Sequence, residues 1–357
     1  MHTPRKLAGA CLALLCLLPG LGAGAADSAV EAEAEAGIED EDSKLGQGMP
    51  RFHRGLDHAS DFAPVGVMLD HTHEKGDWTF LYRYQHDSWQ GLMSGDKSTP
   101  ALALIPEAYD SVPISETVQT HLFGAMYAPH RRFTFAFLLP YQTKHVRSVG
   151  TGIAPSMESD GIGDAKLMFM LPFVQKGREK SQFNFGLTFP TGSIQEHDVT
   201  GQRLPYAMQL GSGTYDFYWG ITYTGRREIL SWGGQFEGIY RVGENSVGYR
   251  LGSVYASSAW IAGSLGRYVT TSARLTWRRT NNIHNADLTL DKTISPLNDN
   301  MKQGGTFIGI GPGVNILLPF FGGQRLSFEA IIPIYQNLDG PQLARELTWT
   351  AGWQWIY

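Results

Sequence analysis

Alternation of apolar and polar residues recurs along the chain from residue 77 to its end. The final residues, LTWTAGWQWIY, place Trp349, Trp353 and Trp355 on one side of an extended segment. A period of two residues is that of a β-strand with two different faces. The sequence therefore predicts about 12 strands, over residues 77–85, 117–127, 132–144, 164–171, 182–189, 214–223, 231–242, 254–262, 269–278, 306–318, 325–335 and 347–357.

Charged residues are absent from the apolar faces of these segments, and large aromatic residues occupy those faces on nearly every strand. So many aromatic faces exceed what one core of this length can bury, whereas a lipid-facing surface accommodates them all. A basic residue on the lipid side of a barrel costs about 2–4 kcal/mol at mid-bilayer, which explains their absence. Lipid also demands that every backbone group be paired internally, as in a closed barrel.

The connections between the predicted strands alternate between long and short, which is typical of outer-membrane barrels. Tyrosine and tryptophan near the strand ends, such as Trp78, Tyr141 and Tyr223, suit interfacial girdles. We expect an all-β fold, an antiparallel transmembrane β-barrel of the bacterial outer-membrane type over residues 77–357. An even number of strands places both termini in the periplasm. Pro140, Pro312 and other prolines in strands predict lost ladder bonds or bulges.

The residues before the barrel divide into three parts. Residues 1–26 have a basic start, a short apolar run and the motif Ala23-Gly24-Ala25, which predict a secretory signal peptide. Residues 27–50 are acidic and lack aromatic residues, so we expect a disordered tail, with an isolated helix as the alternative. Residues 51–76 contain scattered apolar residues and are expected to enter the barrel as a plug or gate.

The composition excludes several classes of protein. Both cysteines, Cys11 and Cys16, lie in the predicted signal peptide, so the remaining chain has no disulfide or thiolate site. The formal charge of -5 and the lack of a basic stripe argue against a nucleic-acid partner. No catalytic motif is found, and we expect neither an enzyme nor a cofactor.

Two histidines are weak candidates for a metal site. His71 and His73 share one side of an extended segment and lie beside Asp70 and Glu74, which would suit Zn²⁺ or Cu²⁺. We interpret them instead as solvated or interior histidines, and we expect no metal. The glycines at 309, 311 and 313 are not followed by a helix, so we interpret them as relieving crowding inside the barrel.

Several segments resemble a bacterial family of outer-membrane transporters named for the phenol meta-cleavage pathway. The resemblance extends over residues 64–357. It rests on PVGVMLDHTHEKGDWTFLYRYQ (64–85), ESDGIGDAKLM (158–168), LTFPTGSI (187–194), RLPYAMQLGSGTYDF (203–217) and LDGPQL (338–343). It implies an outer-membrane barrel with a role in uptake of hydrophobic or aromatic compounds. Separately, the last strand, which ends at Tyr357, resembles the terminal strand of bacterial outer-membrane proteins, whose alternating residues and final aromatic are read by the barrel-assembly machinery.

The function expected is that of a channel or transporter for a small solute, hydrophobic or aromatic, or related to metal uptake. One alternative is a structural or adhesive barrel without transport. The other is an outer-membrane lipase-like enzyme, in which His121 would be a candidate catalytic histidine. We place His121 on the inner face. The expected partners are outer-membrane lipid, lipopolysaccharide and the solute. The solute path is expected to be lined by the charged residues of the polar faces, which are Arg83, Lys144, Asp164, Lys166, Asp216, Glu237, Arg241, Arg274, Arg278 and Glu329.

Overall fold

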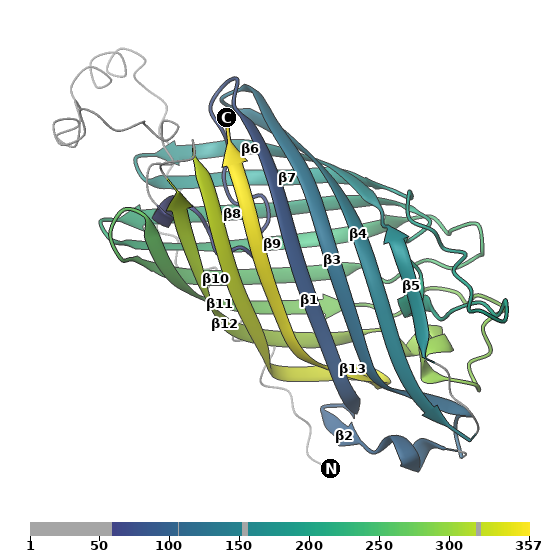
Figure 1. Ribbon diagram of the computed structural model, residues 1–357. Helices are drawn as coiled ribbons and strands as arrows, with labels where there is room; N and C mark the ends of the chain where they lie inside the picture. Colours follow the sequence, from purple (N-terminus) through teal and green to yellow (C-terminus); the bar gives the residue numbers. More distant parts are fainter. Residues whose placement is uncertain (1–58, 106, 152–155, 319–322) are drawn as a thin grey trace, which may run out of the picture. The chain divides into compact units, whose positions relative to one another are not determined.

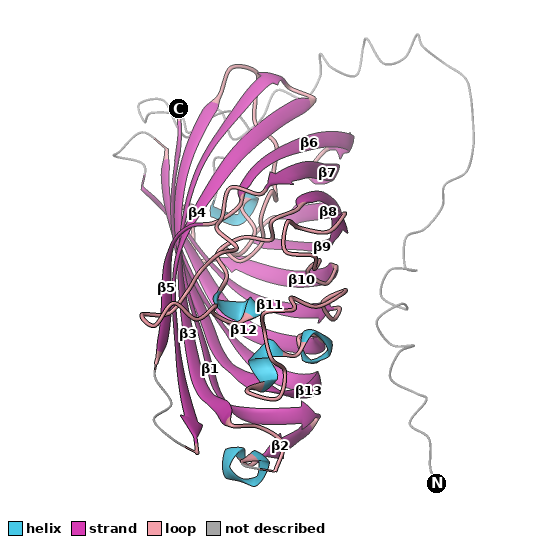
Figure 2. Cartoon of the chain, turned by 90° about the vertical axis from the view of Figure 1, so that its right-hand side faces the viewer, coloured by secondary structure: helices cyan, strands magenta, loops and turns pink. Residues whose placement is uncertain are grey.

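The computed structural model describes residues 59–105, 107–151, 156–318 and 323–357. The expected signal peptide, the acidic tail and residues 51–58 of the expected plug lie outside the described residues. The connections hold short 3₁₀ helices, which Figure 2 shows in cyan: η3 (Ala101–Leu104), η4 (Tyr206–Met208), η5 (Pro296–Asn298) and η6 (Asn300–Lys302), with η2 (Ala59–Asp61) before the first strand. No helix of the described part is long and apolar enough to cross a membrane.

All of the assigned strands belong to one antiparallel sheet (Figure 1). The strands are β1 (Trp78–Gly95), β2 (Lys97–Thr99), β3 (Ser111–His130), β4 (Phe133–Gly150), β5 (Met157–Ile162), β6 (Ala165–Lys176), β7 (Glu179–Phe189), β8 (Tyr215–Arg227), β9 (Leu230–Val242), β10 (Val254–Ser264), β11 (Val269–Thr280), β12 (Gly305–Leu318) and β13 (Gln324–Ile356).

The sheet closes on itself because β13 pairs with both β12 and β1. Both ends of β13 lie at the same end of the barrel, since Gln324 pairs with Leu318, where β12 ends, and Ile356 pairs with Thr79, where β1 begins. Its middle residue Leu338 pairs with both Gly95 and Gly305 at the opposite end. β13 therefore crosses the wall twice, as a hairpin.

Counting β13 as two crossings gives the wall an even number, which a fully antiparallel ring requires. β2 and β5 lie outside the ring, β2 paired with β1 and β5 with β4. The prediction of an antiparallel barrel of about 12 strands is confirmed, and the two halves of β13 correspond to the last two predicted strands.

The two ends of the barrel differ in their connections. The end that holds Trp78 and Tyr357, called the turn end here, has short turns such as 131–132 and 177–178. The opposite end, called the loop end here, holds the long connections. Several strands extend further toward the loop end than the alternation predicted. In these extensions Leu92 of β1 and Val146 of β4 are buried against residues of the connections. β1 continues to Gly95, in a stretch that had been interpreted as a connection.

Burial in this barrel is inverted relative to a water-soluble protein. Polar residues of the inner face are buried, among them Thr79, Asn184 and Thr222. Large apolar residues of the outer face are exposed, including Phe183 and Leu187, which is 44% exposed. This inversion is what a barrel surrounded by hydrocarbon requires.

Two of the strand prolines mark irregular pairing, as the sequence predicted. The register shifts next to Pro172, between β6 and β7, and at Pro333, between β12 and β13. The carbonyl of Pro140 accepts a hydrogen bond from the Gly163 amide at the break between β5 and β6. A proline has no N–H to donate, so the ladder bends or breaks where it occurs.

The inward placement of His121 is wrong. His121 pairs directly with Tyr84 in the β1–β3 ladder, so the two side chains share the outer face. Its Nδ1 lies 2.8 Å from the hydroxyl of Tyr82, another outer-face residue. The β3 strand has small and polar residues on both faces, and its own sequence does not fix which face is inside.

The assignment of the outer surface to lipid predicts the effect of a charge placed on it. We expect Leu187→Arg to lower the free energy of unfolding in phospholipid bilayers by about 2–4 kcal/mol, because the guanidinium would enter hydrocarbon. Val199→Arg, in an exposed connection, is the control and should leave stability within about 0.5 kcal/mol. Denaturant titration in liposomes measures both, and equal effects of the two substitutions would contradict the assignment.

Candidate functional site: the barrel interior

The inner face carries the charged residues predicted from the sequence, and the structure divides them by partner. Arg274 of β11 and Glu329 of β13 form a double hydrogen bond, with Nε and Nη2 donating over 2.8 and 2.7 Å. Between them lies β12, where Arg274 pairs with Gly311 and Glu329 with Gly313. The absence of side chains on these glycines lets the ion pair reach across an intervening strand, which agrees with their predicted role of relieving crowding.

A second ion pair joins neighbouring strands. Asp216 of β8 and Arg241 of β9 are directly opposite in the ladder and form an ion pair. Thr214 donates its hydroxyl proton to the other oxygen of Asp216 over 2.7 Å. Asp216 is fully buried, so these partners are needed to stabilise its charge.

Two of the predicted residues hold the connection between β7 and β8 over the interior. Lys144 donates to the carbonyls of Ala207 and Gln209 over 2.9 and 2.6 Å. Asp164 accepts hydrogen bonds from the amides of Gly192 and Ser212. Both charges therefore anchor residues 190–214, a role that the sequence did not predict.

Each of the other four predicted residues makes one hydrogen bond or none. Glu237 accepts a hydrogen bond from the Tyr218 hydroxyl over 2.7 Å. Arg83 lies 3.5 Å from the carbonyl of Val67. Lys166 and Arg278 make no hydrogen bond or ion pair with the residues that the structure describes. Among the ten predicted residues, these two cations are therefore left available to an ion or solute in the interior.

Residues 59–76, called the N-terminal segment here, lie against this inner face. Near the turn end, Ala59 and Phe62 pack on Leu317 and Ile356. Further in, the side-chain amide of Gln235 donates to the carbonyl of Met68 over 2.7 Å.

Side-chain amides of the wall also hold the next residue of the segment. Gln182 and Asn184, both on β7, donate to the carbonyl of Leu69 over 2.6 and 3.3 Å. Amide side chains of the wall thus satisfy the backbone of a segment that forms no regular structure here, as buried backbone groups require.

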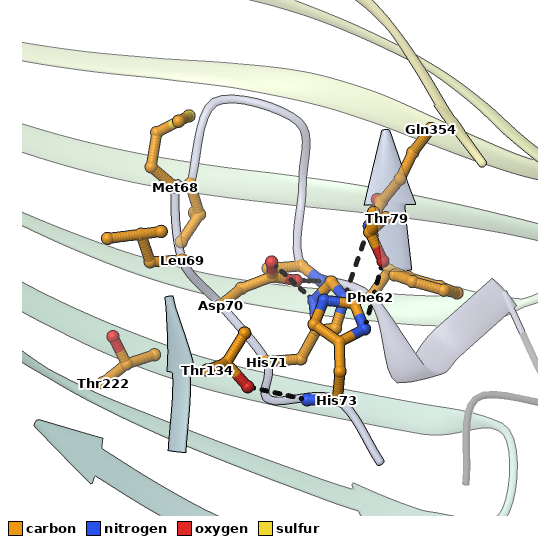
Figure 3. Close-up of polar contacts among 12 residues, drawn as sticks. Phe62, Met68, Leu69, Asp70, His71, His73, Thr79, Thr134, Thr222 and Gln354 are labelled. Atoms are coloured by element: carbon orange, nitrogen blue, oxygen red, sulfur yellow. Dashed lines mark hydrogen bonds and ion pairs between the residues drawn. The ribbon is translucent and has the colours of Figure 1, made fainter. Parts of the chain in front are cut away.

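A bend in the N-terminal segment is fixed by Asp70 (Figure 3). Its carboxylate accepts a hydrogen bond from the Ala63 amide over 2.8 Å and lies 2.8 Å from Nδ1 of His71. Burial opposes the ionisation of Asp70, but His71 and Arg325 attract its charge, so its pKa lies below the usual range. The segment therefore carries a fixed negative charge that ties it to itself and to β13.

Apolar contacts also hold the N-terminal segment against the inner face. Leu69 packs into a methionine-rich patch of the inner face, formed by Met126, Met168 and Met170 with Ala136 and Leu138. The cavity left between the segment and strands β1 and β13 has a volume of about 30 Å³. That is about the space of one water molecule, so the segment packs closely against these two strands.

The two metal candidates have other partners. The rings of His71 and His73 lie 4.8 Å apart, but His71 contacts Asp70, and Nδ1 of His73 lies 3.3 Å from the Thr79 hydroxyl (Figure 3). No group of three or more histidine, cysteine or acidic residues is arranged to hold a metal ion within the described ranges.

Sequence reasoning missed some of the polar interior. Asp87 and Arg345 form an ion pair, with Thr348 donating to the same carboxylate, but both lie in stretches that had been interpreted as connections. The amides of Gln182 and Gln235 were overlooked because only ionisable residues were considered. Their position on the polar face of a predicted strand was the available signal.

No family model and no curated protein matches the sequence. Among solved structures, the chain is similar to an outer-membrane channel from Pseudomonas putida F1, with a TM-score of 0.59 and 12% identity over 82% of this chain and 99% of that one. It also matches the KdgM porin, with a TM-score of 0.38 and 7% identity over 78% of this chain and 98% of that one. A monoaromatic hydrocarbon channel, CymD, matches with a TM-score of 0.37 and 6% identity over 80% of this chain and 89% of that one.

The likeness to the Pseudomonas channel concerns the fold alone, and the two fainter likenesses carry no argument. The fold and its inverted burial define the class: the chain is a closed antiparallel β-barrel with the fold of bacterial outer-membrane proteins.

The ion pair across β12 yields a testable prediction. Glu329→Ala leaves the buried guanidinium of Arg274 without its carboxylate, which should lower the free energy of unfolding by about 3–5 kcal/mol. Adding Arg274→Met should recover most of that loss, because the double variant buries no unpaired charge. Denaturant unfolding of the refolded barrel provides the measurement, and a Glu329→Ala barrel as stable as the parent would contradict the pairing.

Proposed function

We propose that the chain is an outer-membrane channel for a small solute, held closed at rest by its N-terminal segment. The observation that supports the proposal is that residues 59–76 contact the inner face through both hydrogen bonds and apolar packing. The cavity between the segment and strands β1 and β13 has a volume of only about 30 Å³. In our proposal the turn end, with both termini, faces the periplasm, and the loop end faces outward.

The solute we propose is hydrophobic or aromatic. Leu69 covers the methionine-rich patch, so withdrawal of the segment uncovers apolar, adaptable side chains. Lys166, two residues from Met168 on the same face of β6, supplies polar surface beside this patch. The resemblance to the transporter family named for phenol meta-cleavage supports the same class of solute, and the proposal includes no catalytic step.

The proposed partners follow from the same arrangement. Outer-membrane lipid and lipopolysaccharide surround the exposed apolar belt. The strand ending at Tyr357 is proposed as the segment read by the barrel-assembly machinery.

Removal of the segment tests the proposal. Deleting residues 51–74 should raise the single-channel conductance in planar bilayers, because the interior would lose the chain that fills it. Unchanged conductance in a folded deletion variant would rule out the gate. Liposome swelling with graded solutes then separates a channel from a structural barrel, which would admit none of them with or without the segment.

A point substitution provides a sharper version of the same test. A Cβ atom on Gly66 would lie 2.0 Å from Nη2 of Arg274 and 2.1 Å from Oε2 of Glu329. Gly66→Val should therefore displace the segment and raise conductance as the deletion does. Gly263→Val is the matched control, because nothing lies within 4 Å of its Cβ position.

A further inference from the structure

Two cations of the inner face lie beyond the N-terminal segment, in the loop-end half of the interior. On β11 the segment lies against Arg274, and Arg278 is four residues closer to the loop end. On β6 the segment packs against Met168, and Lys166 is two residues closer to the loop end. Both cations therefore lie on the side of the segment that faces the long connections.

Both cations can be reached by a solute in the interior. Arg278 is exposed although it belongs to the inner face, where it pairs with Ala256 and Phe307 in the ladder. Lys166 is half-buried, and its Nζ is neither hydrogen-bonded to a described residue nor enclosed by the protein. Each therefore presents its charge to the space inside the barrel.

The two charges face each other across that space. They project from β6 and β11, which are separated in the wall by the four strands from β7 to β10. Even so, the charge of Arg278 acts on Lys166, and Arg241 acts on both. Like charges held in the interior of a barrel repel each other, so an anion placed between them is attracted by both.

The acidic groups near these cations have other partners, with one exception. Three of them are bound elsewhere: Asp216 to Arg241, Asp87 to Arg345, and Asp164 to the amides of Gly192 and Ser212. The exception is Glu237 of β9, which acts on both Lys166 and Arg278 but forms no ion pair with a residue that the structure describes. One carboxylate therefore faces two unpaired cations, which leaves a place for a second negative charge.

Apolar side chains adjoin the two cations. Phe307 of β12 is directly opposite Arg278 in the ladder and is half-buried. Ile239 lies between Glu237 and Arg241 on the inner face of β9 and is half-buried as well. An anion bound at the cations would therefore have apolar surface for the rest of its body.

We infer that Lys166 and Arg278 form a binding site for a small organic carboxylate. The carboxylate accepts hydrogen bonds from Nζ of Lys166 and from the guanidinium of Arg278. The apolar body of the ligand packs on Phe307 and Ile239. This site deepens the proposed function, on which its role in transport rests, by naming carboxylic acids as the class of hydrophobic or aromatic solute.

Ligand binding to the purified full-length chain in a non-ionic detergent tests the site. Isothermal titration should detect binding of benzoate but not of benzylamine, which has the same ring and the opposite charge, after subtraction of empty-micelle titrations. Lys166→Met and Arg278→Met should each weaken benzoate binding about tenfold, through loss of one charge-assisted hydrogen bond. Arg278→Lys keeps the positive charge and should bind benzoate more tightly than Arg278→Met.

Lys97→Met is the matched control, because it removes the same charge from an exposed residue of β2, outside the ring at the same end of the barrel. It should bind benzoate as the parent does. Equal binding of benzylamine, or unchanged benzoate binding by both Lys166→Met and Arg278→Met, would overturn the inference. The segment-deletion conductance is measured in parallel: no benzoate binding with conductance still raised rejects only this site, and benzoate binding without a conductance change rejects only the gate.

Discussion

The requirement that every backbone polar group in lipid find a partner within the protein governs this structure. An open sheet leaves unpaired edges, so the pairing of β13 with β1 is what allows the chain to lie in a membrane. Closure then fixes the polarity of the side chains. The outer face must be apolar and uncharged, and polar residues are left to the inner face, where they must find partners or water.

The interior satisfies that demand in two ways. Ion pairs between strands neutralise charges where glycines leave room, as Gly311 and Gly313 do between Arg274 and Glu329. Elsewhere, polar side chains of the wall bind backbone groups of segments that are not strands. Gln182, Gln235 and Lys144 all act in this way, the first two on the N-terminal segment and the third on the β7–β8 connection. The same side chains thus complete the barrel and hold in place the segments that lie against its inner face.

The alternation was sufficient to predict the strands because each has one lipid-facing side. Both halves of β13 were predicted as separate strands, although a tight reversal near Gly340 joins them into one. The extensions of β1 and β4 were not predicted, because buried apolar residues there, such as Leu92 and Val146, pack against the connections and do not follow the simple alternation of the lipid-facing part. His121 was placed on the wrong face for a related reason, since the facing of β3 depends on its pairing with β1.

The candidate site could be predicted only in part. The charged residues of the inner face followed from the alternation, but their partners depend on distances across strands that the sequence does not encode locally. The Asp87–Arg345 pair joins residues far apart in the chain, and only closure of the barrel brings them together. The position of the β7–β8 connection over the interior depends on hydrogen bonds to Lys144 and Asp164, which no periodic pattern describes.

The central claim is that successive residues of one strand face lipid and interior in turn. Single-cysteine variants of the chain without Cys11 and Cys16, with Leu187→Cys or the adjacent Thr188→Cys carrying a fluorescent label, test it in liposomes with brominated lipid tails. The account predicts strong quenching at residue 187 and little at residue 188. Equal quenching at both residues, or none at either, would contradict it.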